Sequence, residues 1–378
     1  MTNSNAALAT LIFSTNDKAN QKTGIKKNEN GIRRSCMVDF CIKICRFIFK
    51  ITGYHFTSKI KPCLICRKIP VHYFRLHRLI FAVSIFENYM KAGFVNIFGK
   101  PNAGKSTLLN ALVGEKMAIV SSKVQTTRHR IKAFLTKPGE YQVIFSDTPG
   151  IIEPKYKLHE RMMQSVKSAL EDADIALLIA DATKDLGETK EIFQGLRLKV
   201  PSILVLNKVD KLKPAQVEAA IENFKQSASY KKIIPISALK HSNLNELLSA
   251  IIELLPEGEA FYDEDELTDL PTKFFVSEII REKVYELFSE EIPYQTAVII
   301  NEYKEKESLI KIQADIIVQR ESQKAILLGE GGKMIKKLGT LARTEIENFL
   351  QQKIFLQLFI KVKPKWRDND FKLREYGY

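Results

Sequence analysis

The sequence predicts a doubly wound, mostly parallel α/β sheet followed by a small α+β domain. Three observations predict this fold class. Short β-branched runs alternate with helical stretches between residues 92 and 256, and a glycine-rich turn follows the first run. After residue 271 the order changes to helix, strand, strand, helix, helix, strand. Alternating strands and helices indicate a parallel sheet that binds ligands at the carboxyl ends of its strands.

The predicted strands of the first domain are short apolar runs, as expected for strands that are buried on both faces. They are GFVNIF (93–98), YQVIFS (141–146), DIALLIA (174–180), SILVLN (202–207) and KIIPIS (232–237). The helical stretches after the second strand are LHERMMQSVKSALED (158–172), ETKEIFQGLRLK (188–199), PAQVEAAIENFKQSA (214–228) and NLNELLSAIIELL (243–255).

The second domain opens with the helical stretch FFVSEIIREKVYELF (274–288). Two long alternating runs, YQTAVIINEYKEK (294–306) and SLIKIQADIIVQR (308–320), then predict strands. A short helix, a glycine turn, a longer helix through residue 350 and the strand IFLQLFIKVK (354–363) complete the domain.

Charge and composition suggest where the domains begin and end. The chain has 378 residues and a formal charge of +14, and residues 1–89 hold 15 Lys and Arg against 4 Asp and Glu. Residues 256–271 carry seven acids and no base, which is typical of a solvated linker. We therefore expect a basic extension at 1–89, a first domain at 90–256, an acidic linker at 257–271 and a second domain at 272–378.

The extension at 1–89 has three competing interpretations. It is an organelle-targeting segment, a membrane- or RNA-binding arm, or upstream translation before a true start at Met90, and we favour the last. All five cysteines lie in this extension, so no disulfide is expected after residue 90. Cys63 and Cys66 have the spacing of metal ligands, but one such pair is weak support for a zinc site.

The turn GKPNAGKS has the Gly-x4-Gly-Lys-Ser spacing of a P-loop and lies between a predicted strand and a predicted helix. Backbone N–H groups of such a turn bind the α- and β-phosphates. We expect Lys105 to reach the β- and γ-phosphates and Ser106 to bind Mg²⁺. The predicted phosphate-binding residues are Gly99, Lys100, Pro101, Asn102, Ala103, Gly104, Lys105 and Ser106.

Three further loops follow predicted strands and complete a guanine-nucleotide site. In DTPG, Asp147 is expected to hold Mg²⁺ through water, and the N–H of Gly150 to sense the γ-phosphate. In NKVD, the acceptor-only carboxylate of Asp210 suits the paired donors of guanine. The SAL loop is expected to offer backbone N–H groups to guanine O6. These loops add Asp147, Thr148, Pro149, Gly150, Asn207, Lys208, Val209, Asp210, Ser237 and Ala238 to the predicted site, so the sequence predicts a GTPase.

The segment SSKVQTTRHR lies where a nucleotide-sensing switch is expected. Thr126 and Thr127 are the candidates for closing onto Mg²⁺ in the presence of a γ-phosphate, and we prefer Thr127. The predicted catalytic residues are therefore Lys105, Ser106, Thr127, Asp147 and Gly150. The residue after Gly150 is Ile151, and because an apolar side chain cannot orient water, slow intrinsic hydrolysis is expected.

The chain resembles the Era family of bacterial GTPases over residues 90–378. The stretches that carry the resemblance are GKPNAGKSTLLNALVG, QTTRHRI, DTPG, NKVD, EIIREKVYELFSEEIPY and VKPKW. The resemblance implies a GTPase domain of the translation-factor class and a type II KH domain that binds the 3′ end of small-subunit ribosomal RNA. It also implies a monomer of the cytoplasm that acts on the precursor small-subunit particle, with peripheral association with the inner membrane. The residue matching Asn102 supports a K⁺ ion in related GTPases.

In a KH domain the turn between the two central helices has the pattern GxxG and clamps a nucleic-acid backbone. The matching turn departs from the usual pattern because its second residue is the acid Glu330. The expected RNA-binding residues are Lys324, Gly329, Glu330, Gly331, Gly332, Lys333, Lys336 and Lys337. Two rival functions remain at this point, namely a membrane-surface regulatory GTPase with a structural KH domain and a non-hydrolysing RNA scaffold that uses GTP only for stability.

Overall fold

A computed structural model describes residues 90–121, 123–225 and 230–378. The interpretations of the extension before Met90, and the pair Cys63 and Cys66, lie outside the described residues.

The first domain contains a seven-stranded sheet with the strand order β2-β3-β1-β4-β5-β6. Pairing along this order is parallel except between β2 and β3, and the short β7 pairs antiparallel with the start of β1. The predicted mostly parallel α/β fold is confirmed, but the antiparallel edge strand β2 was not predicted. The strands are β1 (Met90–Phe98), β2 (Ile131–Lys137), β3 (Tyr141–Asp147), β4 (Ile175–Asp181), β5 (Ser202–Asn207), β6 (Lys232–Pro235) and β7 (Glu257–Gly258).

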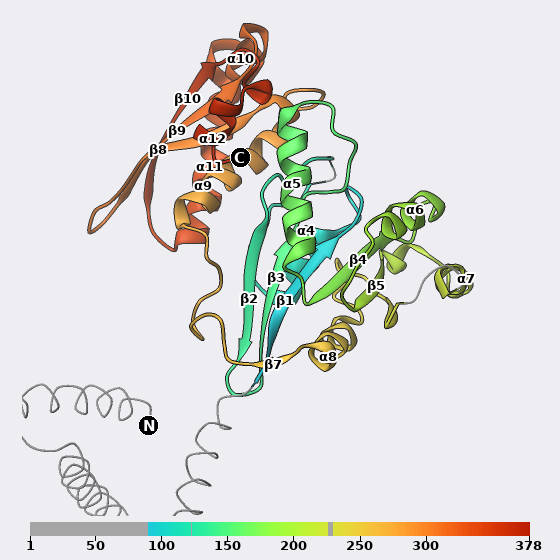
Figure 1. The fold of residues 1–378 in the computed structure, drawn as a ribbon. Coiled ribbons are helices and arrows are strands. Elements are labelled where there is room, and N and C mark those ends of the chain that lie inside the picture. Colours follow the sequence, from blue (N-terminus) through green and yellow to red (C-terminus); the bar gives the residue numbers. More distant parts are fainter. Residues whose placement is uncertain (1–89, 122, 226–229) are drawn as a thin grey trace, which may run out of the picture. The chain divides into compact units, whose positions relative to one another are not determined.

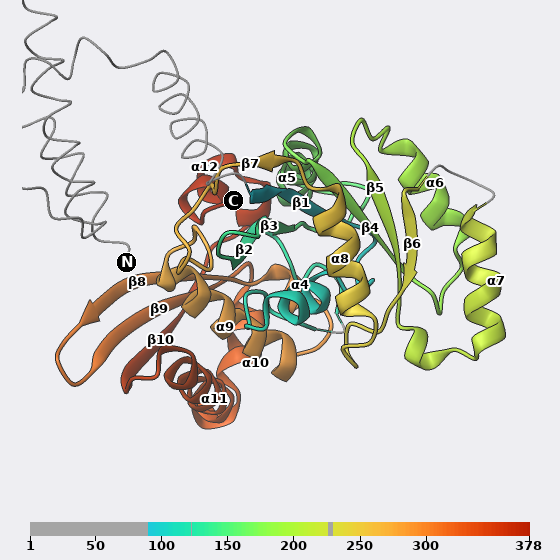
Figure 2. The ribbon, with the colours of Figure 1, turned by 90° about the horizontal axis from the view of Figure 1, so that it is seen from below.

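Helices cover both faces of this sheet (Figures 1 and 2). Alternate residues of β1 enter opposite cores, because side chains along a strand point to opposite faces. Ile97 packs with residues of α4 and α8, whereas Phe98 packs with residues of α5, α6 and α7. The helices are α4 (Lys105–Val113), α5 (Lys157–Glu171), α6 (Gly187–Gly195), α7 (Pro214–Lys225) and α8 (Leu244–Leu254).

The second domain has the predicted order α-β-β-α-α-β. Its sheet has the order β10-β9-β8, with β9 parallel to β10 and antiparallel to β8. A final helix, α12 (Asp370–Glu375), was not predicted. The other elements are α9 (Thr272–Leu287), β8 (Ala297–Glu305), β9 (Ile310–Val318), α10 (Glu321–Leu328), α11 (Lys333–Leu350) and β10 (Ile354–Val362).

The acidic linker is solvated along its side chains but anchored along its backbone. Gln142 of β3 is fully buried, and its side-chain oxygen accepts hydrogen bonds from the N–H groups of Phe261 (2.7 Å) and Tyr262 (3.1 Å). Phe134 of β2 donates its N–H to the carbonyl of Leu267 at 2.8 Å. The linker is therefore solvated along its acidic side chains, and hydrogen bonds of its backbone also attach it to β2 and β3.

Among the residues that the structure describes, none of the helices is both long enough and apolar enough to cross a membrane.

The half-buried His129 lies where the two domains meet. Its ring stacks on Tyr378, with ring centroids 4.5 Å apart, and meets the edge of Phe274. Burial lowers the pKa of His129 to about 4; the nearby Glu278 carboxylate opposes this shift, while Arg281 and Arg128 add to it. The imidazole is consequently neutral in the folded protein at neutral pH.

We predict that acidification below pH 6.5 destabilises the fold partly through His129. Its folded pKa lies below the ordinary value, so the unfolded chain binds the proton first, and stability falls as the pH drops from 6.5 towards 4. One such group costs up to about 1.4 kcal/mol per pH unit in this window. Thermal unfolding of wild type and His129→Gln at pH 7 and pH 5 measures the effect. An equal loss of Tm in both proteins contradicts the prediction.

Candidate functional site

The P-loop connects β1 to α4, so its N–H groups lie at the amino end of a helix. Gly104 has a φ of +101°, and a Cβ atom there would lie 2.2 Å from the side-chain nitrogen of Asn207. A Cβ at Gly99 would lie 2.4 Å from the carbonyl oxygen of Ile179. These two positions require glycine because neighbouring strands approach the turn too closely for any side chain.

Asn207 hydrogen-bonds to the P-loop through its side chain. The side chain is buried, and its nitrogen donates to the carbonyl of Ala103 at 2.9 Å. Its oxygen accepts from the N–H of Ala238 at 3.0 Å. One amide at the end of β5 therefore joins the phosphate-binding loop to the SAL loop.

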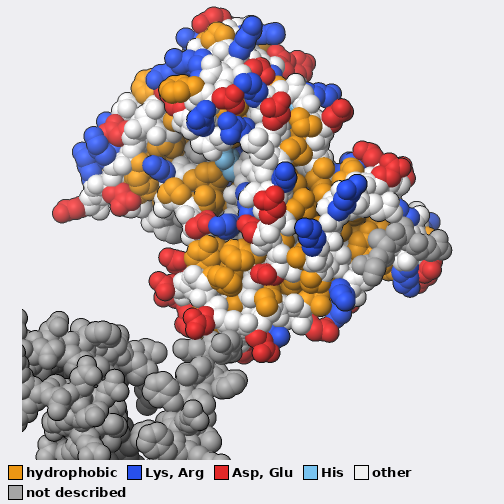
Figure 3. Space-filling model, viewed as in Figure 1, with side chains coloured by type: hydrophobic (Ala, Val, Ile, Leu, Met, Phe, Trp, Pro, Cys, Tyr) orange, Lys and Arg blue, Asp and Glu red, His pale blue; other side chains and the backbone are white. Residues whose placement is uncertain are grey.

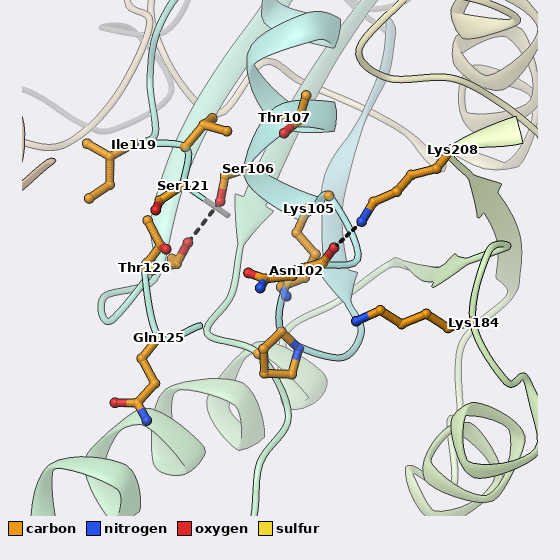
Figure 4. A pocket seen from close by; sticks show the side chains of 15 residues that line it. Asn102, Lys105, Ser106, Thr107, Ile119, Ser121, Gln125, Thr126, Lys184 and Lys208 are labelled. Atoms are coloured by element: carbon orange, nitrogen blue, oxygen red, sulfur yellow. Dashed lines mark hydrogen bonds between the residues drawn. The ribbon is translucent and has the colours of Figure 1, made fainter. Parts of the chain in front are cut away.

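Three side chains converge at the carboxyl end of β3. The Ser106 hydroxyl lies 2.8 Å from the Thr127 hydroxyl, and both donate to one oxygen of Asp147, at 2.6 and 3.0 Å. Figure 4 shows the Ser106 side chain directed towards the segment that contains Thr126. Thr126 does not join them, because its hydroxyl donates to the carbonyl of Lys123 instead. The structure therefore places Thr127, rather than Thr126, with the predicted magnesium ligands.

This cluster fits a hard divalent cation. Asp147 is fully buried, and its second carboxylate oxygen has no hydrogen-bond partner among the described residues. Burial raises the pKa of Asp147, opposed by Lys105, Ser106 and Thr127, and burial lowers the pKa of Lys105, opposed by Asp147. Hydroxyl and carboxylate oxygens are the ligands that Mg²⁺ prefers. Ser106, Thr127 and Asp147 would hold the ion, and Mg²⁺ would neutralise phosphate charge during transfer.

The Lys105 amine lies inside the P-loop. It donates to the carbonyls of Gly99 (3.3 Å) and Lys100 (3.1 Å). These acceptors orient the ammonium group in the turn whose N–H groups bind phosphates. In the same region, a Cβ at Gly150 would lie 2.7 Å from the Pro101 ring, so the DTPG loop approaches the P-loop closely.

Asp210 and Ser237, which are predicted to recognise the base, hydrogen-bond to each other. The Ser237 hydroxyl donates to the Asp210 carboxylate at 2.7 Å, which fixes the carboxylate at the end of β5. Lys208 donates to the carbonyl of Asn102 at 2.7 Å and forms an ion pair with Asp181 at 2.7 Å. The three loops after β1, β4 and β5 are thereby tied together.

Several residues that line the nucleotide pocket, or that pair with its lining residues as Asp181 does with Lys208, were not predicted. Asp181 follows the pattern of the other site residues, an acid at the carboxyl end of a buried strand, and could have been found by that signal. Lys184 is a loop lysine with no motif, yet Figure 4 shows its side chain directed towards the P-loop alongside Lys208. Further lining residues that sequence reasoning missed are Thr107, Ile119, Val120, Ser121 and Gln125.

The second glycine turn connects α10 to α11. Gly329, Gly331 and Gly332 have φ values of +66°, +59° and +79°. A Cβ at Gly329 would lie 2.6 Å from the Met334 side chain, whereas Cβ atoms at Gly331 and Gly332 would meet nothing within 4 Å. The first glycine is thus required by packing, and the other two leave their backbone open to a ligand.

The predicted RNA-binding lysines lie before and after this turn in the chain. Lys333, Lys336 and Lys337 are exposed, and Lys324 is half-buried. The Lys333 amine lies 3.5 Å from the Glu330 carboxylate, and both side chains are exposed. A groove lies between α11, which follows the turn, and β10. Its lining residues, most of which were not predicted, are Ile335, Lys336, Gly339, Thr340, Arg343, Leu356 and Leu358.

Two family models match the chain. A model described as "50S ribosome-binding GTPase" matches residues 94–208, and a model described as "KH domain" matches residues 291–367. The chain is 43% identical over 292 residues to GTPase Era of Clostridium kluyveri, and the match covers 76% of this chain and 99% of the relative.

Solved structures agree with these matches. An Era variant from Aquifex aeolicus bound to GDP and AlF4⁻ is 44% identical, with a TM-score of 0.74. A structure of Era with MgGDPNP and nucleotides 1506–1542 of 16S ribosomal RNA has the same identity and TM-score. Each match covers 76% of this chain and 99% of the other. The nucleotide loops, the GxxG turn and these similarities together show that the chain belongs to the Era family of GTPases.

Proposed function

We propose that this GTPase binds the 3′ end of 16S ribosomal RNA through its KH domain and assists the assembly of the small ribosomal subunit. The observation that carries the proposal is the open backbone of Gly331 and Gly332 beside the exposed lysines of α11. Support also comes from the Era structure that contains nucleotides 1506–1542 of 16S ribosomal RNA.

The chemistry of the KH surface suits a single-stranded RNA. Figure 3 shows Lys and Arg side chains, with acids among them, over the part of the surface formed by α10 and the β8–β10 sheet. The groove between α11 and β10 adds the apolar side chains Ile335, Leu356 and Leu358 and the cation Arg343. A KH domain holds four nucleotides in this way, with the backbone at GxxG and the bases over an apolar groove.

We also propose that the chain is a cytoplasmic monomer that acts on the precursor small-subunit particle and associates peripherally with the inner membrane. Support for this part comes from membership of the Era family. Co-sedimentation of the protein with precursor particles, and its distribution between soluble and membrane fractions, are the measurements that test it.

The RNA-binding role is tested by Gly331→Asp combined with Gly332→Asp. These substitutions place two negative charges where phosphates would pass. Their Cβ atoms meet nothing within 4 Å, but the positive φ at both positions adds backbone strain, so circular dichroism should confirm that the variant is folded. RNA affinity should fall at least tenfold, about 1.4 kcal/mol, with a weaker dependence on salt. GTP affinity should stay unchanged because the P-loop lies in the other domain. Fluorescence anisotropy with a 3′-end 16S fragment measures the effect.

A matched control is Gly139→Asp, in the turn between β2 and β3. Gly139 also has a positive φ, +72°, and a Cβ there would meet nothing within 4 Å. This variant introduces the same residue type far from the KH groove. Unchanged RNA affinity in the double variant would show that the second turn only ends a helix.

Guanine specificity should rest on Asp210. An unpaired buried donor costs roughly 1–3 kcal/mol, so Asp210→Asn should weaken GTP binding by about a few kcal/mol. The variant should favour xanthosine triphosphate. The amide can donate to the carbonyl that replaces the amino group of guanine. Competition between the two nucleotides for the variant measures the preference, and equal competition refutes it.

We further propose that hydrolysis depends on K⁺ bound beside Asn102. Ile151 packs against the apolar core that includes Phe98, so it supplies no polar group to the transferred phosphate. A monovalent cation would supply charge stabilisation of the transition state. Turnover should therefore be faster in K⁺ than in Na⁺, and Asn102→Gly, which tolerates the φ of +62° at this position, should abolish the difference. Identical rates of the wild type in both salts show that K⁺ has no role.

A further inference from the structure

The switch segment (residues 123–128) lies between the nucleotide pocket and the KH domain. Gln125, Thr126 and Thr127 line the pocket that also contains the P-loop. The same segment contacts α9, the turn Pro293–Gln295 (η2) and the carboxyl terminus of the chain. These groups of the KH domain form hydrogen bonds with the residues before and after Thr127.

The residues before Thr127 are held through their main chain. The Tyr285 hydroxyl of α9 donates to the carbonyl of Gln125 at 2.9 Å. The Arg281 guanidinium, also from α9, donates to the carbonyl of Thr126. Arg281 is itself fixed by two hydrogen bonds to Glu278, and both side chains are buried.

The residue after Thr127 is held through its side chain. Arg128 is 2% exposed, and one of its terminal nitrogens donates to the carbonyl of Thr296 at 2.7 Å. The other donates to the carbonyl of Pro293 at 2.9 Å and to the hydroxyl of Tyr285 at 3.3 Å. The nitrogen that bonds to Thr296 also donates to the hydroxyl of Tyr378, at 3.3 Å.

This interface between the two domains buries guanidinium groups that are not fully paired within the described residues. No carboxylate of the described residues forms an ion pair with Arg128, and its Nε and the Nη1 of Arg281 are buried without partners there. Burying a cation costs free energy unless it is fully paired, and an apolar contact of equal area would stabilise the interface better. What the arginines do provide is geometry, because a planar fork bonded to several carbonyls fixes position and orientation.

We propose that Arg128, Arg281 and Tyr285 are positioning residues for GTP hydrolysis, through which the KH domain holds Thr127 at Ser106 and Asp147. Thr127 is the only residue between Thr126 and Arg128, so its hydroxyl follows any movement of these two anchors. GTP turnover by the first domain thus depends on how the second domain is seated. The inference rests on the GTPase activity of the family and is independent of which RNA the KH domain binds.

The test uses Tyr285→Phe in the full chain, which removes one hydroxyl and keeps the ring. The matched control is Tyr294→Phe, because the Tyr294 ring lies 6.1 Å from that of Tyr285 at the same interface, and its hydroxyl makes no hydrogen bond to the described residues. We expect kcat for GTP to fall at least fivefold in Tyr285→Phe and to stay within twofold of the wild type in Tyr294→Phe. Arg128→Lys keeps the charge but loses the fork, and we expect a larger loss of kcat.

A binding readout separates positioning from general damage. Thr127 is expected to meet Mg²⁺ only with a γ-phosphate, so Tyr285→Phe should bind fluorescent GDP as the wild type does. It should bind a non-hydrolysable GTP analogue at least threefold more weakly and require more Mg²⁺ to do so. Hydrogen exchange of the amides of residues 124–128 with this analogue should be faster than in the wild type.

Three outcomes overturn the inference. They are a kcat of Tyr285→Phe within twofold of that of Tyr294→Phe, an equal loss of GDP and analogue affinity, and unchanged amide exchange in the switch segment. A wild-type chain without GTP turnover is a different failure, because it contradicts the GTPase activity itself.

Discussion

Thr127 is held from two sides, and this double constraint connects the two domains of the chain. On one side its hydroxyl bonds to Ser106 and Asp147, the expected magnesium ligands. On the other side the neighbouring carbonyl of Thr126 and the side chain of Arg128 bond to the KH domain. Nucleotide-dependent movement of Thr127 cannot occur without some change at these contacts.

The nucleotide loops were predictable because each one follows its own buried strand. Gly99 follows β1, Asp147 ends β3 and Asn207 ends β5, and parallel pairing brings these ends to one edge of the sheet. The spacing of the motifs along the chain was therefore enough to predict which loops meet at the site. Asp181 ends β4 in the same way, and only the lack of a named motif hid it.

The interdomain contacts were not predictable from local patterns. Arg128 and Thr296 are 168 residues apart, and Arg281 reads in the sequence as an ordinary charged residue of an amphipathic helix. Its burial depends on docking of α9 against the switch segment, which no periodicity reveals. The same holds for α12, where Asp370 bonds to Lys157 and Arg161 of α5. The edge strand β2 was missed because it pairs antiparallel with β3 and so lies outside the alternation of strands and helices.

The proposed hold on Thr127 couples the position of the KH domain to the nucleotide state. Linkage then requires that RNA and the γ-phosphate influence each other's binding by the same factor. The most direct measurement is the Kd of a 3′-end 16S ribosomal RNA fragment for the full chain loaded with GDP and with a non-hydrolysable GTP analogue. We predict tighter RNA binding in the analogue-bound state, with an equal tightening of the analogue by RNA. The same Kd in both nucleotide states would contradict the coupling.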